Sequence, residues 1–196
     1  MKIYQLFALI IMAVFYLAYF TKMYLQKRRG IQTHQINKGV KPQETKQVER
    51  IMGFATLAIV VMELVSIFFD MRMFAVTPLT VVGLLVAAIG DMTFIVAMIT
   101  MKDSWRAGIS ESEKTQLITD GIYRFSRNPA FLGFDLMYIG IMLAFLNIPL
   151  LCFTVLVVIS LHLQILQEEK FLITVFGNSY KEYQKRTCRY LGVMRH

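Results

Sequence analysis

The segment 136–167 constrains the fold most, because it runs for 32 residues without an Asp, Glu, Lys or Arg. As one α-helix it would be about 48 Å long at 1.5 Å per residue, which exceeds a hydrocarbon core of about 30 Å. Asn147, Ile148 and Pro149 interrupt the run with residues typical of turns. We therefore expect a tight hairpin of two membrane helices, over roughly 130–146 and 150–167.

The composition is also that of a membrane protein. Hydrophobic residues make up 56% of the 196 residues and charged residues 17%, against about 45–50% and 25% in soluble domains. Further uncharged runs predict spans over 3–20, 51–69 and about 76–100, with a polar linker at 22–50. No signal-peptide cleavage pattern follows the first run, so we expect it to be retained. The expectation is a single all-α membrane domain over 1–196, with about five transmembrane helices and three of them in 1–101.

The basic residues predict how these helices are oriented. Of the 21 Lys and Arg residues, all but Lys2 and Arg72 fall in 22–50, in 102–129 or after 167. Five spans place these three segments on one side, and the positive-inside rule assigns that side to the cytoplasm. We expect a cytoplasmic C-terminus, in the plasma or inner membrane of a prokaryote or the endoplasmic reticulum of a eukaryote. Cytoplasmic loops account for the net charge of +8 without a nucleic-acid partner.

The cysteines and histidines point to no metal site. Cys152 and Cys188 do not form a disulfide framework. The three histidines lie far apart, without the spacing of metal ligands (His34, His162 and His196).

Two polar segments carry the candidate chemistry. Arg124 and Arg127 are three residues apart, and arginine forks hold carboxylates or phosphates in two-point geometry; the alternative is contact with lipid headgroups. Glu168 and Glu169 follow the last span, where they can orient an amine, bind a ribose diol or pair with the arginines. Their alternative is an ordinary helix surface with weak local ion pairs to Lys170. An amphipathic helix after Gly177 is expected to pack on this cytoplasmic mouth.

Four ionisable residues fall within or near the predicted spans: Glu63, Asp91, Asp135 and His162. Such groups face a bundle interior or a wet cavity, because charge is costly in lipid. Each of them can be functional, or a structural group that completes a hydrogen bond.

Several short motifs follow one another over roughly 102–190. They are Trp105-Arg106, Gly121-x-Tyr123-x-x-x-Arg127-Asn128-Pro129, the helical hairpin, Glu168-Glu169 and Phe176-Gly177-x-x-Tyr180-x-x-Tyr183. In this order they resemble the isoprenylcysteine carboxyl methyltransferase family, and related phospholipid methyltransferases share the pattern.

The resemblance implies a membrane methyltransferase that uses S-adenosylmethionine, releases S-adenosylhomocysteine and places its catalytic, cofactor-binding region in 102–196. The acceptor implied is a lipid or lipidated molecule from the bilayer, such as an isoprenylcysteine-type carboxylate. Arg127 and Glu168 are the predicted catalytic residues. The predicted cofactor-binding residues are Gly121 and Arg124, together with the residues that the family motifs supply: Tyr123, Arg127, Asn128, Pro129, Glu168 and Glu169.

Two positions depart from the family pattern. Asn128 stands where the family usually has His, so hydrogen bonding survives but proton transfer does not. Phe131 stands where the family usually has Tyr, which removes a hydroxyl. Two alternatives stay open: an NADPH-dependent sterol or polyprenyl reductase, for which no Gly-rich phosphate loop is evident, and a non-catalytic membrane scaffold or transporter, for which no paired repeats are evident.

Overall fold

The structure is a computed structural model that describes residues 1–33, 35–36, 38, 41–74, 77–106 and 116–193. Its long helices are α1 (Ile3–Arg28), α2 (Gln43–Phe68), α3 (Thr77–Met101), α4 (Pro129–Ala144) and α5 (Ile148–Phe176). The short helix α6 (Asn178–Arg186) follows, and two 3-10 turns, η1 (Lys102–Ser104) and η2 (Gly121–Arg124), lie between α3 and α4. The expected all-α architecture is confirmed; the predicted start of the third span at residue 76 lies outside the described residues.

Four helices are long and apolar enough to cross a membrane: α1, α2, α3 and α5. The 16-residue α4 is about 24 Å long at 1.5 Å per residue, so it needs its non-helical flanks to cross a core of about 30 Å. Large hydrophobic side chains are exposed along these helices, as expected where lipid is the solvent. The chain is therefore an integral membrane protein.

The expected hairpin is α4–α5, and Asn147 builds its turn. The Asn147 side chain accepts from the backbone N–H of Leu150 (2.9 Å) and donates to the Ser66 hydroxyl (3.0 Å) and the Phe145 carbonyl (2.8 Å). The second arm does not end at residue 167. It continues to Phe176, because no Gly or Pro interrupts it before Gly177, whose φ of 55° ends the helix. The motif glutamates thus lie within one continuous helix.

Glycines bring α3 and α4 into very close contact. Gly83 and Gly90 on α3 face Gly140 and Gly133 on α4, and the two glycines of each helix are spaced seven residues apart. A Cβ on Gly83 would lie 2.6 Å from the carbonyl oxygen of Gly140, and one on Gly133 would lie 2.9 Å from that of Gly90. Small residues permit this backbone approach in membrane helix pairs, and it sets where α4 begins relative to α3.

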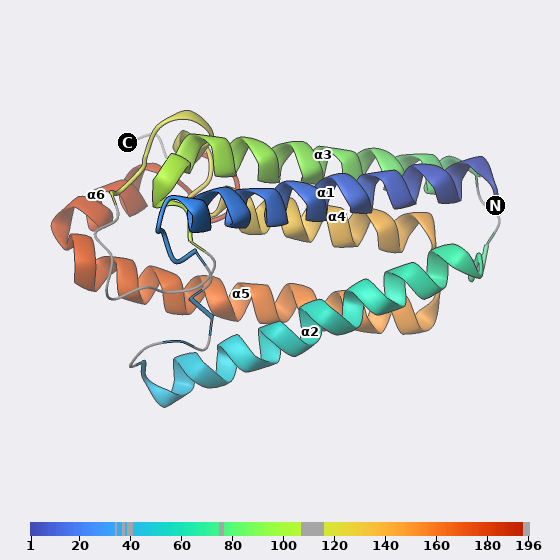
Figure 1. Cartoon of the computed structure of the whole chain (residues 1–196), viewed down its shortest axis with the longest axis horizontal. Coiled ribbons are helices and arrows are strands. Elements are labelled where there is room, and N and C mark those ends of the chain that lie inside the picture. The colour runs from blue at the N-terminus through green and yellow to red at the C-terminus, as the bar shows by residue number, and fades with distance from the viewer. Residues whose placement is uncertain (34, 37, 39–40, 75–76, 107–115, 194–196) are drawn as a thin grey trace.

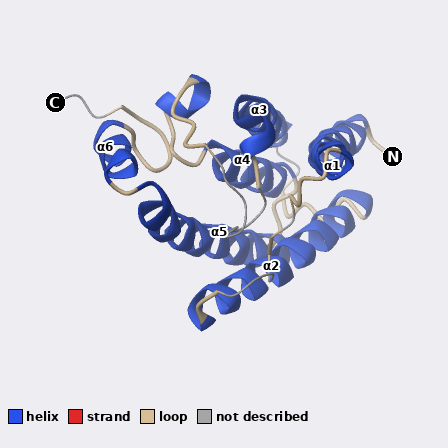
Figure 2. Cartoon of the chain, turned by 60° about the vertical axis from the view of Figure 1, so that its left-hand side comes forward, coloured by secondary structure: helices blue, strands red, loops and turns tan. Residues whose placement is uncertain are grey.

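The helices form two layers, with α1, α3 and α4 in one and α2 and α5 in the other (Figures 1 and 2). The N-terminus, the α4–α5 connection and the described part of the α2–α3 connection lie at one end of the bundle. The described parts of the linker after α1 and of the segment between α3 and α4 lie at the other end, together with α6 (Figure 1). The described parts of the three basic segments therefore gather at one end, as expected for segments on one side of a membrane. We call this the basic end.

Candidate active site

The turn 121–129 is one segment of the site, and its backbone conformation determines which of its side chains are buried and which are exposed. Gly121 has φ of +60°, and a Cβ there would lie 3.0 Å from the Thr100 side chain, so a glycine suits both the backbone and the space. The 3-10 turn that follows buries Tyr123, which is 6% exposed, and leaves Arg124 exposed. Tyr183 of α6 donates its hydroxyl to the Tyr123 carbonyl at 2.6 Å, which holds α6 against this turn.

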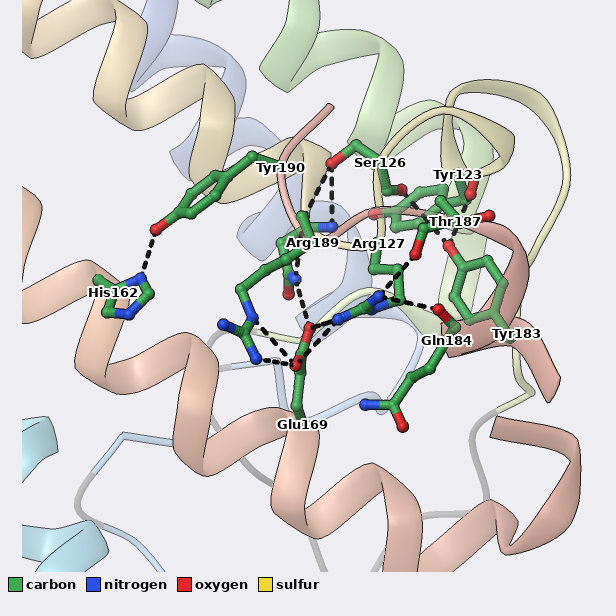
Figure 3. A network of polar contacts seen from close by, with 11 residues as sticks. Tyr123, Ser126, Arg127, His162, Glu169, Tyr183, Gln184, Thr187, Arg189 and Tyr190 are labelled. Atoms are coloured by element: carbon green, nitrogen blue, oxygen red, sulfur yellow. Dashed lines mark hydrogen bonds and ion pairs between the residues drawn. The ribbon is translucent and has the colours of Figure 1, made fainter. Parts of the chain in front are cut away.

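Glu169 is the centre of a buried polar network (Figure 3). Arg127 donates to it from Nε (3.1 Å) and Nη2 (2.9 Å), and Arg189 donates from Nε (3.1 Å) and Nη2 (2.9 Å). The Asn128 amide nitrogen adds a bond of 3.1 Å. Two arginine forks and an amide therefore converge on one carboxylate, the strong charge-assisted geometry.

Arg127 also fixes the chain after α6. Its Nη1 donates to the carbonyls of Thr187 (2.5 Å) and Gln184 (3.3 Å), and its backbone N–H donates to the Cys188 carbonyl (3.0 Å). The segment 187–193, which we call the tail clasp, returns to the turn where the Gly192 N–H donates to the Phe125 carbonyl at 2.8 Å. Arg127 and Glu169 thus join α4, α5 and the tail clasp in one unit.

Glu168 points away from this network. Consecutive residues of an α-helix project about 100° apart, so Glu169 faces the tail clasp while Glu168 faces the bundle. The Glu168 carboxylate accepts from Nε2 of Gln164 at 3.1 Å, one turn earlier on α5. Two adjacent glutamates therefore have separate surroundings.

Two adjoining cavities meet at Glu168. The smaller, of about 140 Å³, lies among η2, α4, α5 and α6, and it is lined in part by aromatic rings of Tyr123, Phe176, Tyr180 and Tyr183. The larger, of about 300 Å³, lies among α1, α2, α4 and α5, and its lining is mostly apolar. Five residues line both cavities: Trp105, Arg106, Ala130, Phe131 and Glu168. We call these five residues the shared wall.

Burial keeps the phenols of the smaller cavity neutral. The pKa of Tyr123, of Tyr180 and of Tyr183 is raised well above its ordinary value, with desolvation as the main cause. These hydroxyls therefore act as hydrogen-bonding groups and not as phenolates at neutral pH. In the tail clasp, the hydrogen bond to Glu169 raises the pKa of Arg189, so the pair stays charged.

The predicted site residues divide into two sets. Tyr123, Arg127, Asn128 and Glu168 line the smaller cavity. Glu169 is buried beside it, Pro129 begins α4, Gly121 shapes the turn and Arg124 is exposed, and none of these four lines either cavity. The departing residue Phe131 lies in the shared wall.

The sequence patterns predicted neither the role of Arg189 nor the partner of His162. Arg189 sits 20 residues beyond Glu169, in a basic tail where nothing marks one arginine over another. The His162 Nδ1 lies 2.7 Å from the Tyr190 hydroxyl, with the two rings stacked at 6.0 Å, so the tail clasp also contacts α5 there (Figure 3). Of the possible roles for His162, this contact supports the structural one.

Comparison with known proteins adds a family and several relatives. Residues 78–179 match the family described as phospholipid methyltransferase. Relatives include the protein-S-isoprenylcysteine O-methyltransferases of Saccharomyces cerevisiae, 33% identical over 110 residues (55% of this chain, 46% of the relative), and Schizosaccharomyces pombe, 34% over 71 residues (36% and 30%). A probable protein-S-isoprenylcysteine O-methyltransferase of Oryza sativa subsp. indica is 31% identical over 108 residues (54% and 56%). The chain thus spans about a third to a little over half the length of these relatives.

Proposed function

The chain belongs to the phospholipid methyltransferase family, and from that premise we propose that it is a membrane-embedded methyltransferase that uses S-adenosylmethionine and acts on a lipid-like or prenylated acceptor. The observation that carries the proposal is the pair of cavities with a shared wall. Methyl transfer needs the donor and the acceptor to meet in line at one point. Two cavities that meet at Glu168 and Phe131 offer such a point.

The smaller cavity suits the cofactor, which supplies an electrophilic methyl group on a cationic sulfonium when bound. Its buried aromatic rings match a purine, and Glu168 is a carboxylate for the ammonium or the ribose hydroxyls of the cofactor. Asn128 adds a hydrogen-bonding group to the lining of this cavity. In this proposal Glu168 contacts the cofactor directly. Arg127 and Glu169 hold the tail clasp in place and thereby position the lining of the cavity.

The larger cavity suits the acceptor. Its lining is mostly apolar, and its charged residues among those described are Arg106 and Glu168, both in the shared wall. An amphiphile would therefore place its apolar part among α1, α2 and α4, and its reacting group at the shared wall. Because the relatives are protein-S-isoprenylcysteine O-methyltransferases, an S-prenylcysteine carboxylate is the first acceptor to test. We further propose that the basic end faces the cytoplasm, following the positive-inside rule.

Direct binding and transfer test this function. Purified protein in detergent is titrated with S-adenosylmethionine by calorimetry, then incubated with the methyl-labelled cofactor and an N-acetylated S-prenylcysteine. Glu168→Gln should weaken cofactor binding by about ten- to a hundredfold, the worth of one charge-assisted contact of about 1.5–3 kcal/mol. Arg124→Gln is the control and should bind as the wild type, because Arg124 lies off both cavities. No binding by the wild-type protein would refute the proposal.

A further inference from the structure

Glu63 is a buried carboxyl that the proposed reaction does not use. It lies on α2, five residues before the end of that helix, with 0% of its surface exposed. Neither carboxyl oxygen has a hydrogen-bond partner among the described residues. Ionisable groups inside a membrane bundle are costly and mark binding sites or pathways, and an unsatisfied buried polar group calls for a missing partner. A purely structural hydrogen-bonding role is not what this geometry provides.

Glu63 is not itself a lining residue of the larger cavity, but it lies about one helical turn beyond the last α2 residue that lines it, Val60. On α2 the cavity is lined by Gly53, Thr56 and Val60, and Glu63 continues that helical stripe one turn farther from the basic end. Tyr16 and Tyr138 are the deepest of the lining residues on α1 and α4, judged from the direction of each helix (Figure 1). Glu63 interacts electrostatically with both tyrosines.

The two tyrosine hydroxyls are themselves only partly occupied. They lie 3.3 Å apart and form one hydrogen bond between them, whereas each hydroxyl can donate once and accept twice. Glu63, Tyr16 and Tyr138 therefore make a polar cluster, which we call the deep cluster. Its two tyrosines line a cavity whose other lining is mostly apolar. A plain hydrocarbon tail would fill the cavity and leave these groups without partners.

We infer that the deep cluster is a subsite for a hydroxyl group on the far part of the acceptor, remote from the methylated group. A hydroxyl suits the cluster because it both donates, to the Glu63 oxygens, and accepts, from a tyrosine. From Ala130 in the shared wall to Tyr138 is eight residues of α4, about 12 Å at 1.5 Å per residue. The acceptor class is thus an amphiphile with polar groups about that far apart, and this inference rests on the proposed function of the larger cavity.

A matched pair of ligands tests the subsite without any need for turnover. Lauric acid and its ω-hydroxy counterpart differ only by the terminal hydroxyl. The single tryptophan, Trp105, lies in the shared wall, so its fluorescence reports binding of either ligand to the detergent-purified protein. The wild type should bind the ω-hydroxy acid about fivefold more tightly relative to the plain acid, the worth of one hydrogen bond.

Variants show whether the deep cluster causes that preference. Glu63→Leu should abolish or reverse it, Glu63→Gln should retain it because an amide still accepts, and Tyr138→Phe should reduce it. Tyr24→Phe is the control, since Tyr24 is an exposed phenol on α1. Comparing ratios between variants cancels the partition of each ligand into the detergent micelle. Glu63→Leu is expected to fold, because it removes a buried polar group that lacks a described partner.

The outcomes separate this inference from the proposed function. If S-adenosylmethionine binds and the plain acid binds, but the wild type shows no preference for the hydroxyl, the deep cluster is not a hydroxyl subsite. An unchanged preference in Glu63→Leu overturns the inference in the same way. If neither fatty acid binds while the cofactor does, the larger cavity is not the acceptor site. If the cofactor itself fails to bind, the proposed function is wrong.

Discussion

Replacing Glu169 should release the tail clasp, and the burial of its ion pairs determines how much the free energy of opening changes. Glu169 and Arg127 have side chains only 5% and 7% exposed, and breaking such a buried pair by removing one partner costs about 3–5 kcal/mol. Arg189 is 36% exposed, so the contribution of its ion pair with Glu169 falls to about 0.2–1 kcal/mol after solvent screening. At the lower figure of about 3 kcal/mol, Glu169→Gln should raise the population of the opened clasp by about 150-fold.

Hydrogen exchange followed by mass spectrometry measures this opening. The reporting amides are those of Arg127, Cys188 and Gly192, which donate to backbone carbonyls within the clasp or across to the turn. Glu169→Gln should accelerate their exchange by about two orders of magnitude, and Arg189→Ala by less than about tenfold. The α3 amides, which lie outside the clasp, are the internal reference.

Glu168→Gln is the matched control, because it makes the same chemical change one residue earlier. It should leave clasp exchange near the wild-type rate while weakening cofactor binding. Equal exchange in the two variants would refute the division between a positioning and a cofactor-binding glutamate. So would wild-type exchange in Glu169→Gln.

Three further predictions follow from other parts of the structure. Asn128→His should keep methyl transfer within about tenfold, because a ring N–H can replace the bond to Glu169, whereas Asn128→Ala should raise the Michaelis constant for the cofactor. Gly90→Leu should lower the thermal stability of the detergent-purified protein, as its side chain would meet the α4 backbone at the Gly133 carbonyl; wild-type melting would contradict this. Burial alone would raise the pKa of Asp70, but hydrogen bonds from Arg72, Tyr4 and Lys2 outweigh it and hold that pKa well below its ordinary value. The stabilisation that ionised Asp70 gives to the folded protein should therefore be present above the ordinary carboxyl pKa and be lost in acid as the pH falls through the folded-state pKa. Asp70→Asn should remove this acid dependence from the melting temperature.

The sequence predicted the fold well where its signals were local. Uncharged length, the Asn147–Pro149 break and the basic segments each follow from one stretch of chain, and helices, hairpin and basic end all agree with them. The glycines at 83, 90, 133 and 140 carried an equally local signal, small residues spaced two turns apart. They could have predicted the contact of α3 with α4.

The site was less predictable, because residues of the same type differ there only in the direction in which the fold points their side chains. Arg124 and Arg127 are alike in sequence, but Arg124 ends the 3-10 turn and is exposed, whereas Arg127 follows the turn and has a side chain only 7% exposed. Arg189 was one of several arginines and lysines in the tail, and only the return of the chain to Phe125 places it at Glu169. Such choices depend on turn geometry and on contacts between segments far apart in the chain.

The hairpin explains why the Arg127 motif and the glutamate pair work at a fixed separation. Arg127 lies two residues before α4, and Glu169 lies 42 residues farther along the chain. The chain leaves the basic end on the 16 residues of α4 and returns on α5, so whether the two side chains meet depends on the lengths of both arms. A single residue added to α5 before Glu168 would turn both glutamates by about 100°. Glu168 would then leave the shared wall and Glu169 would leave the arginines, so the number of residues between the motifs matters as much as the motifs themselves.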